Sequence, residues 1–331
     1  MATNASPTSA RVLADPPVPP LEEASALTCI QPGGGVCFAL ETAWGGVRRA
    51  WLRAARPSYV RRMAERRQGS CEACSHDVVD ARDLKQLRNA CGYFFREEDD
   101  PFRWREKLRL ARVGLAEVVV SSFVCAAVLI PVVATALVRG FWPLWIVAGS
   151  IALLWFEMVW FFRDPVRVIP EDPDALLSPS DGVVTHIDEV EASGFPGGRA
   201  ARISIYLSPW DVHLNRVPRH ARVVSVRYFR GAFVTASRED CVVRNEQLWT
   251  DLVEPNGRLL RVKQISGALA RRLVCALKVG EEVRAGNRFG MIKYGSRTDV
   301  LIPVGETVER VAKVGDRLLA GTSILLRFGK C

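Results

Sequence analysis

Two long apolar segments constrain the possible folds of this chain more than any other feature of its sequence. Residues 118–138 and residues 141–162 are nearly continuous runs of apolar side chains, separated only by Arg139 and Gly140. As a helix, each run is long enough to cross a hydrocarbon layer of roughly 30 Å. The two runs therefore predict a transmembrane helical hairpin, which we assign to residues 113–162.

The charges around the hairpin predict its orientation. Many basic side chains precede and follow it, whereas only Arg139 lies in its turn. Positively charged flanks stay in the cytoplasm, so both ends of the hairpin are expected there. This pattern predicts a protein of the cell (inner) membrane with its main domain on the cytoplasmic side. A helical pair buried inside a soluble domain is the alternative. The flanking basic residues are Arg103, Arg105, Lys107, Arg109, Arg112, Arg163 and Arg167.

Composition narrows the class of partner. The chain has 331 residues, 49% of them hydrophobic, and a formal net charge of +9. A basic protein can bind nucleic acid or an anionic membrane surface. The sequence lacks zinc-finger spacing and aromatic residues interleaved with basic ones, so we expect an anionic lipid partner and no nucleic acid. Nine cysteines without a cleavable signal peptide indicate a reducing cytoplasm and mostly free thiols.

Residues 1–112 form a basic N-terminal extension, which we expect to be partly disordered. Residues 1–40 contain several prolines and a glycine run and predict a poorly ordered tail. Within residues 41–67, apolar side chains recur at helical spacing, and arginines occupy the other faces. Such a helix suits the lipid headgroup region, although a solvated basic helix has the same pattern. The recurring side chains are Trp44, Val47, Trp51 and Ala54.

The extension also contains a group of residues of the types that bind zinc. They are Cys71, Cys74, His76 and Cys91. Their spacing is irregular, and the sequence has no second Cys-x-x-Cys pair. We therefore predict no metal site here, and the sequence leaves the role of these residues open.

From residue 163 onward the sequence changes to short alternating runs of apolar residues, bounded by glycine, proline, asparagine and aspartate. This texture predicts a mainly β domain over residues 163–331. A weak internal repeat relates residues 278–286 to residues 313–321, and each unit reads as strand, turn, strand and turn. Two such units predict a β-sandwich or barrel of the kind seen in lipoyl and biotinyl carrier domains.

Three positions in the β domain carry reactive groups. Gly295 allows close approach to its carbonyl, and the hydroxyl of Ser296 could attack that carbonyl. Asp181 lies in a turn before a strand, and His213 lies in a polar loop after one. Each position taken alone has a structural reading: a strand bulge, a turn aspartate and a structural histidine.

Five ordered motifs together resemble one family, the pyruvoyl-dependent phosphatidylserine decarboxylases, in their short membrane-hairpin form. The resemblance covers roughly residues 113–331. It departs at Arg216, where larger members carry a second histidine. The motifs are Phe161-Phe-Arg-Asp-Pro165, Ser178-Pro-Ser-Asp-Gly182, Ser208-Pro-Trp-Asp-Val-His213, Asn245-Glu246, and Phe289-Gly with Gly295-Ser296.

The resemblance implies a proenzyme that cuts itself between residues 295 and 296. Ser296 attacks the carbonyl of Gly295 and converts the amide to an ester, with Asp181, His213 and Ser296 acting as an acid–base–nucleophile relay. β-Elimination and loss of ammonia then turn Ser296 into a pyruvoyl group. A large chain of residues 1–295 and a small chain of residues 296–331 are expected to remain associated.

The implied reaction is decarboxylation of phosphatidylserine to phosphatidylethanolamine and CO2, a lyase step in phospholipid biosynthesis. The pyruvoyl carbonyl forms a Schiff base with the amine of the serine head group and takes up the electrons left behind. His213 is the expected proton donor, and Asn245 is a candidate for holding the head group. No metal or added cofactor is implied. The sequence does not decide whether His213 alone serves both reactions, nor whether the protein is a homo-oligomer.

Two other functions fit parts of the sequence. A membrane-tethered serine hydrolase would use Asp181, His213 and Ser296 without self-cleavage, but the Gly-x-Ser-x-Gly elbow of such enzymes is missing. A lipoyl- or biotinyl-like carrier module would need a lysine at a hairpin tip. Lys293 is the candidate, but it lies within an apparent strand.

Overall fold

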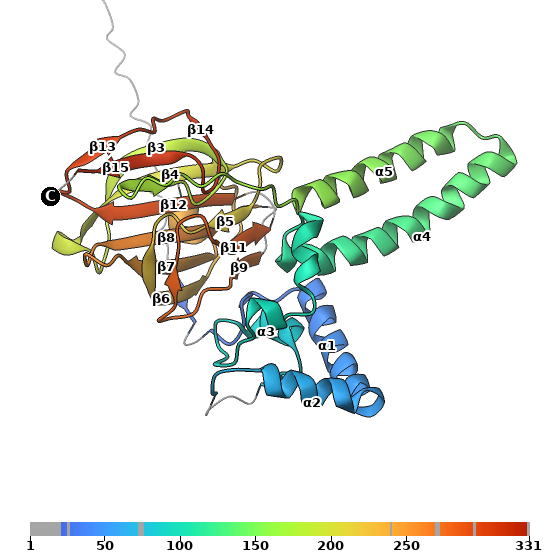
Figure 1. The fold of residues 1–331 in the computed structure, drawn as a ribbon. Helices are drawn as coiled ribbons and strands as arrows, with labels where there is room; N and C mark the ends of the chain where they lie inside the picture. Colours follow the sequence, from blue (N-terminus) through green and yellow to red (C-terminus); the bar gives the residue numbers. More distant parts are fainter. Residues whose placement is uncertain are drawn as a thin grey trace, which may run out of the picture.

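The structure is a computed structural model that describes residues 21–24, 27–71, 76–238, 240–268, 272–293 and 296–329. It has three parts, which Figure 1 shows together. A β domain forms one end, a long helical hairpin projects from it, and a small helical unit lies beside the base of the hairpin. The first 20 residues of the predicted tail, and Gly295, lie outside the described residues.

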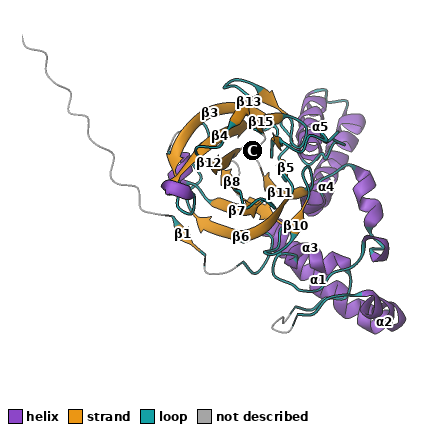
Figure 2. Ribbon diagram, turned by 60° about the vertical axis from the view of Figure 1, so that its left-hand side comes forward, coloured by secondary structure: helices purple, strands orange, loops and turns teal. Residues whose placement is uncertain are grey.

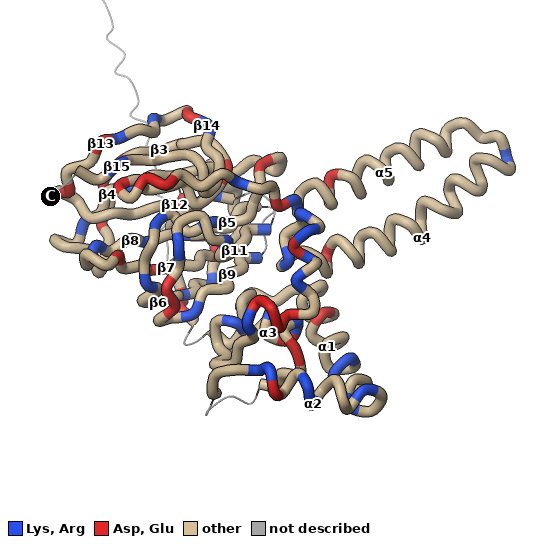
Figure 3. The backbone as a smooth tube through the Cα atoms, in the orientation of Figure 1, with Lys and Arg blue, Asp and Glu red and all other residues tan. Residues whose placement is uncertain are grey.

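The hairpin consists of α4 (Leu115–Arg139) and α5 (Pro143–Phe161). Both helices are long and apolar enough to cross a membrane by length and composition, and only 6% and 11% of their most apolar windows are buried. Their apolar side chains therefore face outward, which is the opposite of a helical pair buried in a soluble domain. Figure 3 shows that the hairpin is nearly uncharged along its length and that basic residues gather at its base.

The predicted mainly β domain is confirmed, and all its strand pairs within sheets are antiparallel. The large sheet has the order β1-β6-β7-β8-β12-β4-β3-β14, with β10 paired to β6. Two small sheets have the orders β5-β11-β9 and β13-β15-β2. Figure 2 shows the large sheet curving around the small ones. The strands are β1 (Glu22–Glu23), β2 (Ala175–Leu177), β3 (Gly182–Glu191), β4 (Arg199–Leu207), β5 (Leu214–Arg216), β6 (Ala221–Arg230), β7 (Gln247–Val253), β8 (Leu259–Ser266), β9 (Arg272–Cys275), β10 (Glu282–Val283), β11 (Arg288–Lys293), β12 (Ser296–Pro303), β13 (Val308–Arg310), β14 (Arg317–Leu318) and β15 (Ile324–Phe328).

The core of the β domain lies between the curved large sheet and the two small sheets. Apolar side chains from all three sheets form one buried cluster, because alternate residues of each strand point to the same side. Strand β12 is central, since it pairs with β4 on one side and β8 on the other and every one of its residues is buried. A residue on β12 is therefore shielded from water by its neighbours.

The two copies of the internal repeat have the same local hydrogen bonds. In the first, the Gly280 N–H donates to the Val223 carbonyl at 2.7 Å, and in the second the Gly315 N–H donates to the Val184 carbonyl at 2.8 Å. Each copy contains a two-residue strand, β10 or β14, that pairs with the large sheet. The wider likeness to lipoyl and biotinyl domains stays a prediction.

The helical unit is more ordered than the sequence suggested. Ile30, within the predicted tail, is only 3% exposed, and its carbonyl accepts from the Cys275 N–H at 2.9 Å. The composition of this segment did not predict its ordered structure, because the main-chain bond at Ile30 is made to a strand far along the chain. The predicted helix over 41–67 is two helices, since Pro57 begins the second. The remaining helices are α1 (Val36–Ala55), α2 (Pro57–Arg66), α3 (Ala81–Leu87), α6 (Cys241–Arg244), and the 3-10 helices η1 (Glu97–Asp99), η2 (Arg103–Leu108), η3 (Arg112–Gly114) and η4 (Pro196–Gly198).

Candidate active site

Ser296 is the first residue of β12 and is fully buried. It lies opposite Leu207 of β4 and opposite Ser266 of β8. Within the described part of the chain, neither the Oγ of Ser296 nor that of Ser266 has a hydrogen-bond partner. Buried polar atoms without partners are rare in folded proteins. Two of them on neighbouring strands therefore mark this end of β12 as a candidate reaction site.

The loop that carries His213 spans the same end of β12. It leaves β4 after Leu207, directly opposite Ser296. It then meets β11 at Ile292, whose N–H donates to the His213 carbonyl at 3.2 Å. Ile292 and Ser296 bracket the predicted cleavage position, so the sheet registers bring the His213 loop to that position.

His213 has the protonation state of a general base. Its Nδ1 lies 2.9 Å from the carbonyl oxygen of Asp211, and a carbonyl can only accept, so Nδ1 carries the proton. The lone pair is then on Nε2. The imidazole is completely buried against the ring of Phe161, at 4.5 Å between centroids. Burial lowers the pKa of His213 to about 4, so the ring is neutral at pH 7.

Asp211 fixes the loop, and the sequence analysis did not single it out. One carboxylate oxygen accepts from the N–H of Ser208 at 2.8 Å and from its hydroxyl at 2.7 Å. The other accepts from Arg317 at 2.5 Å. These bonds hold the turn whose backbone carbonyl orients His213. Asp211 is part of the Ser208–His213 motif, which is where its importance could have been noticed.

The described hydrogen bonds of Asp181 go to Arg167 and Ala320, and its predicted place in a relay with His213 and Ser296 stays a prediction. Its carboxylate accepts from Arg167 at 2.6 and 2.9 Å and from the N–H of Ala320 at 2.7 Å. Burial raises the pKa of Asp181, and the bonds from Ala320 and Arg167 oppose that rise. The turn that carries Asp181 still borders the site, because the Pro179 carbonyl accepts from the Arg216 N–H at 2.8 Å. The structure therefore places Asp181 near the site but pairs it with a cation.

The side-chain amide of Asn245 is hydrogen-bonded to other residues of the protein. Its side chain is fully buried, and its Nδ2 donates to the carbonyls of Val234 at 2.7 Å and of Ser266 at 2.6 Å. Its Oδ1 accepts from the Val234 N–H at 2.9 Å. These bonds tie a loop to the strand end opposite Ser296. They favour a positioning role for Asn245 over direct contact with a head group.

Arg216, which stands where larger family members carry a second histidine, is a structural residue. Its guanidinium donates to Asp164 at 3.1 Å and to the Gly286 carbonyl at 3.0 Å. Asp164 belongs to the motif at the end of α5 and also pairs with Arg288. Arg216 thus links the segment at the end of the hairpin to the β domain, and the loop that carries His213 starts after the residue opposite Ser296.

Lys293 and the context of Ser296 bear on the two alternative functions. Lys293 is buried, forms an ion pair with Glu117 at the start of α4, and donates to Gln31 at 2.9 Å. A carrier lysine must be exposed to receive its group, so this environment does not suit a carrier module. Ser296 is followed by strand β12, whereas a hydrolase elbow is followed by a helix.

The base of the hairpin packs directly on the site. Phe161 and Phe162 at the end of α5 are completely buried, and they share a cluster with Val212 and Leu214 of the His213 loop and strand and with Met291 of β11. The candidate site therefore lies where the hairpin meets the β domain.

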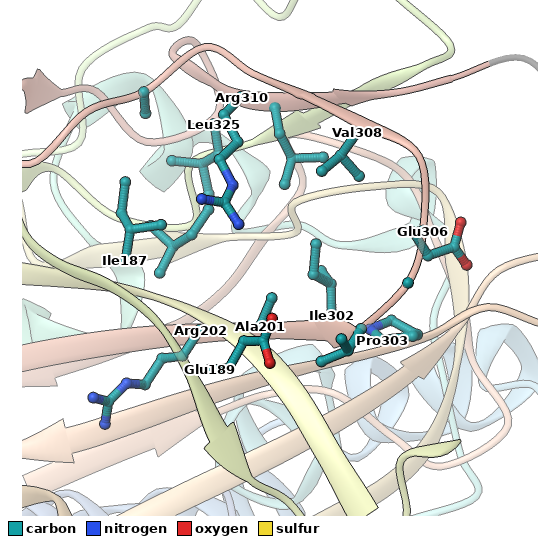
Figure 4. Close-up of a pocket in the computed structure, with 15 residues that line it drawn as sticks. Ile187, Glu189, Ala201, Arg202, Ile302, Pro303, Glu306, Val308, Arg310 and Leu325 are labelled. Atoms are coloured by element: carbon teal, nitrogen blue, oxygen red, sulfur yellow. The ribbon is translucent and has the colours of Figure 1, made fainter. Parts of the chain in front are cut away.

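The pocket in Figure 4 lies elsewhere. It is lined by residues around the far end of β12, including Ile302, Pro303 and Glu306. At about 3.3 Å per residue, Pro303 is about 23 Å along the strand from Ser296. This pocket is therefore separate from the candidate site.

Comparison with known proteins agrees with this geometry. A family model described as phosphatidylserine decarboxylase matches residues 156–326, which contain His213, Ser296 and the turn of Asp181. The chain belongs to the phosphatidylserine decarboxylase family. The family model starts at residue 156, so α1, α2 and α3 lie outside the matched region.

Three relatives illustrate the similarity, and each is named phosphatidylserine decarboxylase proenzyme. The protein from Rhodopirellula baltica is 40% identical over 247 residues, which is 74% of this chain and 99% of the relative. The protein from Symbiobacterium thermophilum is 40% identical over 186 residues, or 56% and 84%. The protein from Chlorobium chlorochromatii is 36% identical over 227 residues, or 66% and 100%.

Proposed function

We propose that this protein is made as a proenzyme that cuts itself between Gly295 and Ser296 and then decarboxylates phosphatidylserine to phosphatidylethanolamine at the membrane surface. Membership of the family and the name proenzyme carried by its relatives support the reaction. One structural observation supports the mechanism most. The loop that carries a neutral, buried histidine starts directly opposite a buried serine whose hydroxyl has no partner among the described residues, and this loop packs on the base of an apolar hairpin.

In the proposed self-cleavage, His213 acts as the base and Ser296 as the nucleophile. His213 Nε2 accepts the hydroxyl proton as Ser296 Oγ attacks the carbonyl carbon of Gly295, and the peptide nitrogen becomes the amine of Ser296. The amide is thereby converted to an ester. Removal of the Ser296 α-proton breaks the ester by β-elimination and leaves a carboxylate on Gly295. Water then replaces the nitrogen, and ammonia leaves. Asp211 keeps His213 in the tautomer that this sequence needs.

The end of β12 also suits the group that the cut would generate. Residue 296 lies in a dry environment with the Ser266 hydroxyl on the facing strand as a polar neighbour. When formed, a pyruvoyl group supplies an electron sink for the carbanion that remains after loss of CO2. His213 is the candidate to deliver the proton that replaces CO2.

One histidine can serve both reactions if its pKa changes between them. In the uncut chain burial keeps His213 neutral, which suits a base. The cut adds a carboxylate at residue 295, next in sequence to Ser296. A nearby negative charge favours the protonated form of histidine and raises its pKa. We propose that cleavage itself converts His213 from a base into a proton donor.

We further propose that the hairpin spans the membrane with both ends in the cytoplasm. The outward-facing apolar side chains of α4 and α5 and the basic residues at their base support this. The site at the hairpin base would then lie at the depth of the lipid head groups. An anionic phospholipid could reach the site without leaving the bilayer.

Helix α1 is proposed to lie on the same membrane surface. Its apolar stripe is exposed, while its arginines face the protein: Arg49 pairs with Asp83 at 2.9 Å and with Asp77 at 3.1 Å. A solvated helix would show the reverse, so lipid is the better candidate to cover the stripe. Figure 1 shows α1 running across the direction of the hairpin, as a helix in the membrane plane would. The stripe consists of Val36, Leu40, Trp44, Val47 and Trp51, each more than half exposed.

Intact-mass spectrometry of the purified protein tests the cut. The expected result is a fragment of residues 296–331 that is lighter by one ammonia than its serine-started mass. Ser296→Ala should leave one uncut chain, and Ser225→Ala on β6 is the matched control that should mature normally. A wild-type chain that stays intact during incubation with membrane lipid would overturn the proenzyme mechanism.

A lipid assay tests the reaction. Mature protein in mixed micelles with phosphatidylserine should release CO2 and form phosphatidylethanolamine, and the Ser296→Ala protein should form none. If the mature, pyruvoyl-bearing protein lacked this activity, the proposed self-cleavage would stand, but phosphatidylserine would not be the substrate.

A further inference from the structure

Three ligand-type side chains of the helical unit come together although the sequence spacing did not suggest a site. The Sγ atoms of Cys71 and Cys91 and an imidazole nitrogen of His76 all lie within 4.8 Å of one another. We propose that these three residues bind a zinc ion that braces the N-terminal helical unit against the β domain. Cys74, the fourth residue of the sequence pattern, lies outside the described residues.

The backbone around the cluster is built for close approach. Gln68 and Phe94 exchange two main-chain hydrogen bonds, each of 2.9 Å. A Cβ on Gly92 would lie 2.0 Å from the Ser70 carbonyl oxygen, and a Cβ on Gly69 would lie 2.3 Å from the Gly92 carbonyl oxygen. Only glycine at both positions lets the two segments approach this closely. This approach is what brings the Cys71 thiol to Cys91.

A main-chain donor already points at one of the proposed ligands. The N–H of Gly92 donates to Sγ of Cys71 at 3.3 Å. Such a bond favours the thiolate, which is the form of cysteine that binds metals, and fixes its direction. The contact comes from the residue next to Cys91, so one short turn orients both thiols.

The ligand set selects the metal. Two thiolates and one imidazole suit Zn²⁺, and the two thiolate charges balance the charge of the ion. Tetrahedral bonds of about 2.3 Å would place the two sulfur atoms about 3.8 Å apart. Closing the present cluster around an ion therefore requires a contraction of only about 1 Å. Water or another side chain would fill the fourth position.

The cluster lies close to the contact between the helical unit and the β domain. The carbonyl of Cys91 accepts from Nζ of Lys278 at 2.9 Å, and Arg88 pairs with Glu281 at 2.5 Å, so this segment touches the β domain. The helical unit itself buries few apolar side chains. Small units of this kind often depend on a metal for their stability. The proposed ion would thus join the segments that follow α2 and α3, and the second of these segments contacts the β domain.

Metal content tests the proposal directly. The full-length protein is expressed in zinc-containing medium and purified in detergent under reducing conditions. Its bound zinc is then quantified by elemental mass spectrometry. We expect about one zinc per chain, since the cluster is a single site. Cys71→Ser, Cys91→Ser and His76→Ala should lose it. Cys125→Ser in the hairpin is the matched control and should keep it. Wild-type protein without zinc, or full zinc in both cysteine variants, would overturn the site.

Cobalt binding gives a second readout, which does not depend on the metal that the protein retains during purification. Chelator-treated wild-type protein titrated with Co²⁺ should show thiolate-to-cobalt absorption and the intense visible bands of tetrahedral cobalt. Cys71→Ser should weaken binding by more than about 100-fold, the upper range for losing an outer-shell partner. Equal spectra in wild type and Cys71→Ser would refute the assignment.

Self-cleavage serves as the folding control. The cluster is apart from Ser296 and His213, so the cysteine variants should still mature, which would show that their β domain is folded. Zinc binding without cleavage would count against the proposed function alone. Cleavage without zinc binding in the wild-type protein would count against the metal site alone.

Discussion

The β domain and the N-terminal helical unit use their apolar residues in opposite ways. In the β domain, side chains such as Leu260 and Ile205 are fully buried between sheets, and the candidate site shares that dry interior. In the helical unit, the apolar stripe of α1 is exposed, and the described contacts that hold the unit together are largely ion pairs such as Arg49–Asp83 and Arg82–Asp80.

The contrast shows that burial has different functions in the two regions. In the β domain, exclusion of water both stabilises the fold and keeps His213 neutral. In the helical unit, arginines of α1 face the protein and pair with aspartates, whereas the apolar stripe of α1 faces outward.

Replacing the buried base should nearly stop self-cleavage. A positioned general base contributes about 10²–10⁴-fold, so His213→Gln should slow maturation by at least about 100-fold in a time course of chain separation on gels. His186→Gln, on half-buried strand β3, is the matched control and should mature at the normal rate. Normal maturation of His213→Gln would remove His213 from the mechanism.

Equivalent truncations should have very different costs in the two regions. Leu260→Ala leaves a cavity in a closed core and should lower the free energy of unfolding by about 2–5 kcal/mol. Trp51→Ala removes a side chain that is 54% exposed and should change it by no more than about 0.5 kcal/mol. Denaturant titration in detergent checks both values. A large loss with Trp51→Ala would mean that the stripe packs against protein, contrary to the membrane-facing assignment of α1.

Acid should destabilise the β domain through His213. The folded pKa of about 4 is below the ordinary value of 6.5, so between these values the unfolded chain binds a proton that the folded chain does not. Stability attributable to this group is therefore fully present above pH 6.5 and is lost as pH falls toward 4, by up to about 3 kcal/mol. Unfolding curves measured across this range should show the loss, and His213→Gln should reduce it. Equal pH dependence in both proteins would contradict the buried neutral state.

The smallest effect should separate two aspartates. Asp211→Asn weakens the turn that orients His213 and should slow self-cleavage by about 10-fold, as expected for a partner outside the reacting atoms. Asp181→Asn should slow it less, because the described partners of Asp181 are Arg167 and Ala320. The same maturation time course compares them. If Asp181→Asn were the slower variant, the relay inferred from the sequence would be restored, with Asp181 moving to His213 during the reaction.

Local patterns were sufficient for the elements and for the family. The two apolar runs predicted α4 and α5 to within a few residues, because a helix of continuous apolar residues needs no tertiary partner to be identified. Short alternating runs after residue 163 predicted the β character of the larger domain in the same way. Motif order also predicts that Ser296 and His213 belong to one site, and this stays a prediction.

Predictions that depended on long-range partners did less well. The ordered segment around Ile30 was missed because its stability comes from a bond to Cys275, far along the chain. The ion pair of Asp181 with Arg167 was not predicted, because the sequence gives no indication of which cation lies nearest to a carboxylate. Asp211 and Ser266 were overlooked because their roles arise from a turn and from a strand register.

The hairpin, the β character of the larger domain and the family could be inferred from the sequence alone, which also predicts Ser296 and His213 as the reactive serine and histidine. These follow from periodicity and from short ordered motifs, which are local properties of the chain. The folded structure was needed for the protonation state of His213, the partner of Asp181, the outward direction of the α1 stripe and the meeting of Cys71, His76 and Cys91. Each of these depends on burial or on distances between residues far apart in the chain, and such quantities exist only after the chain has folded.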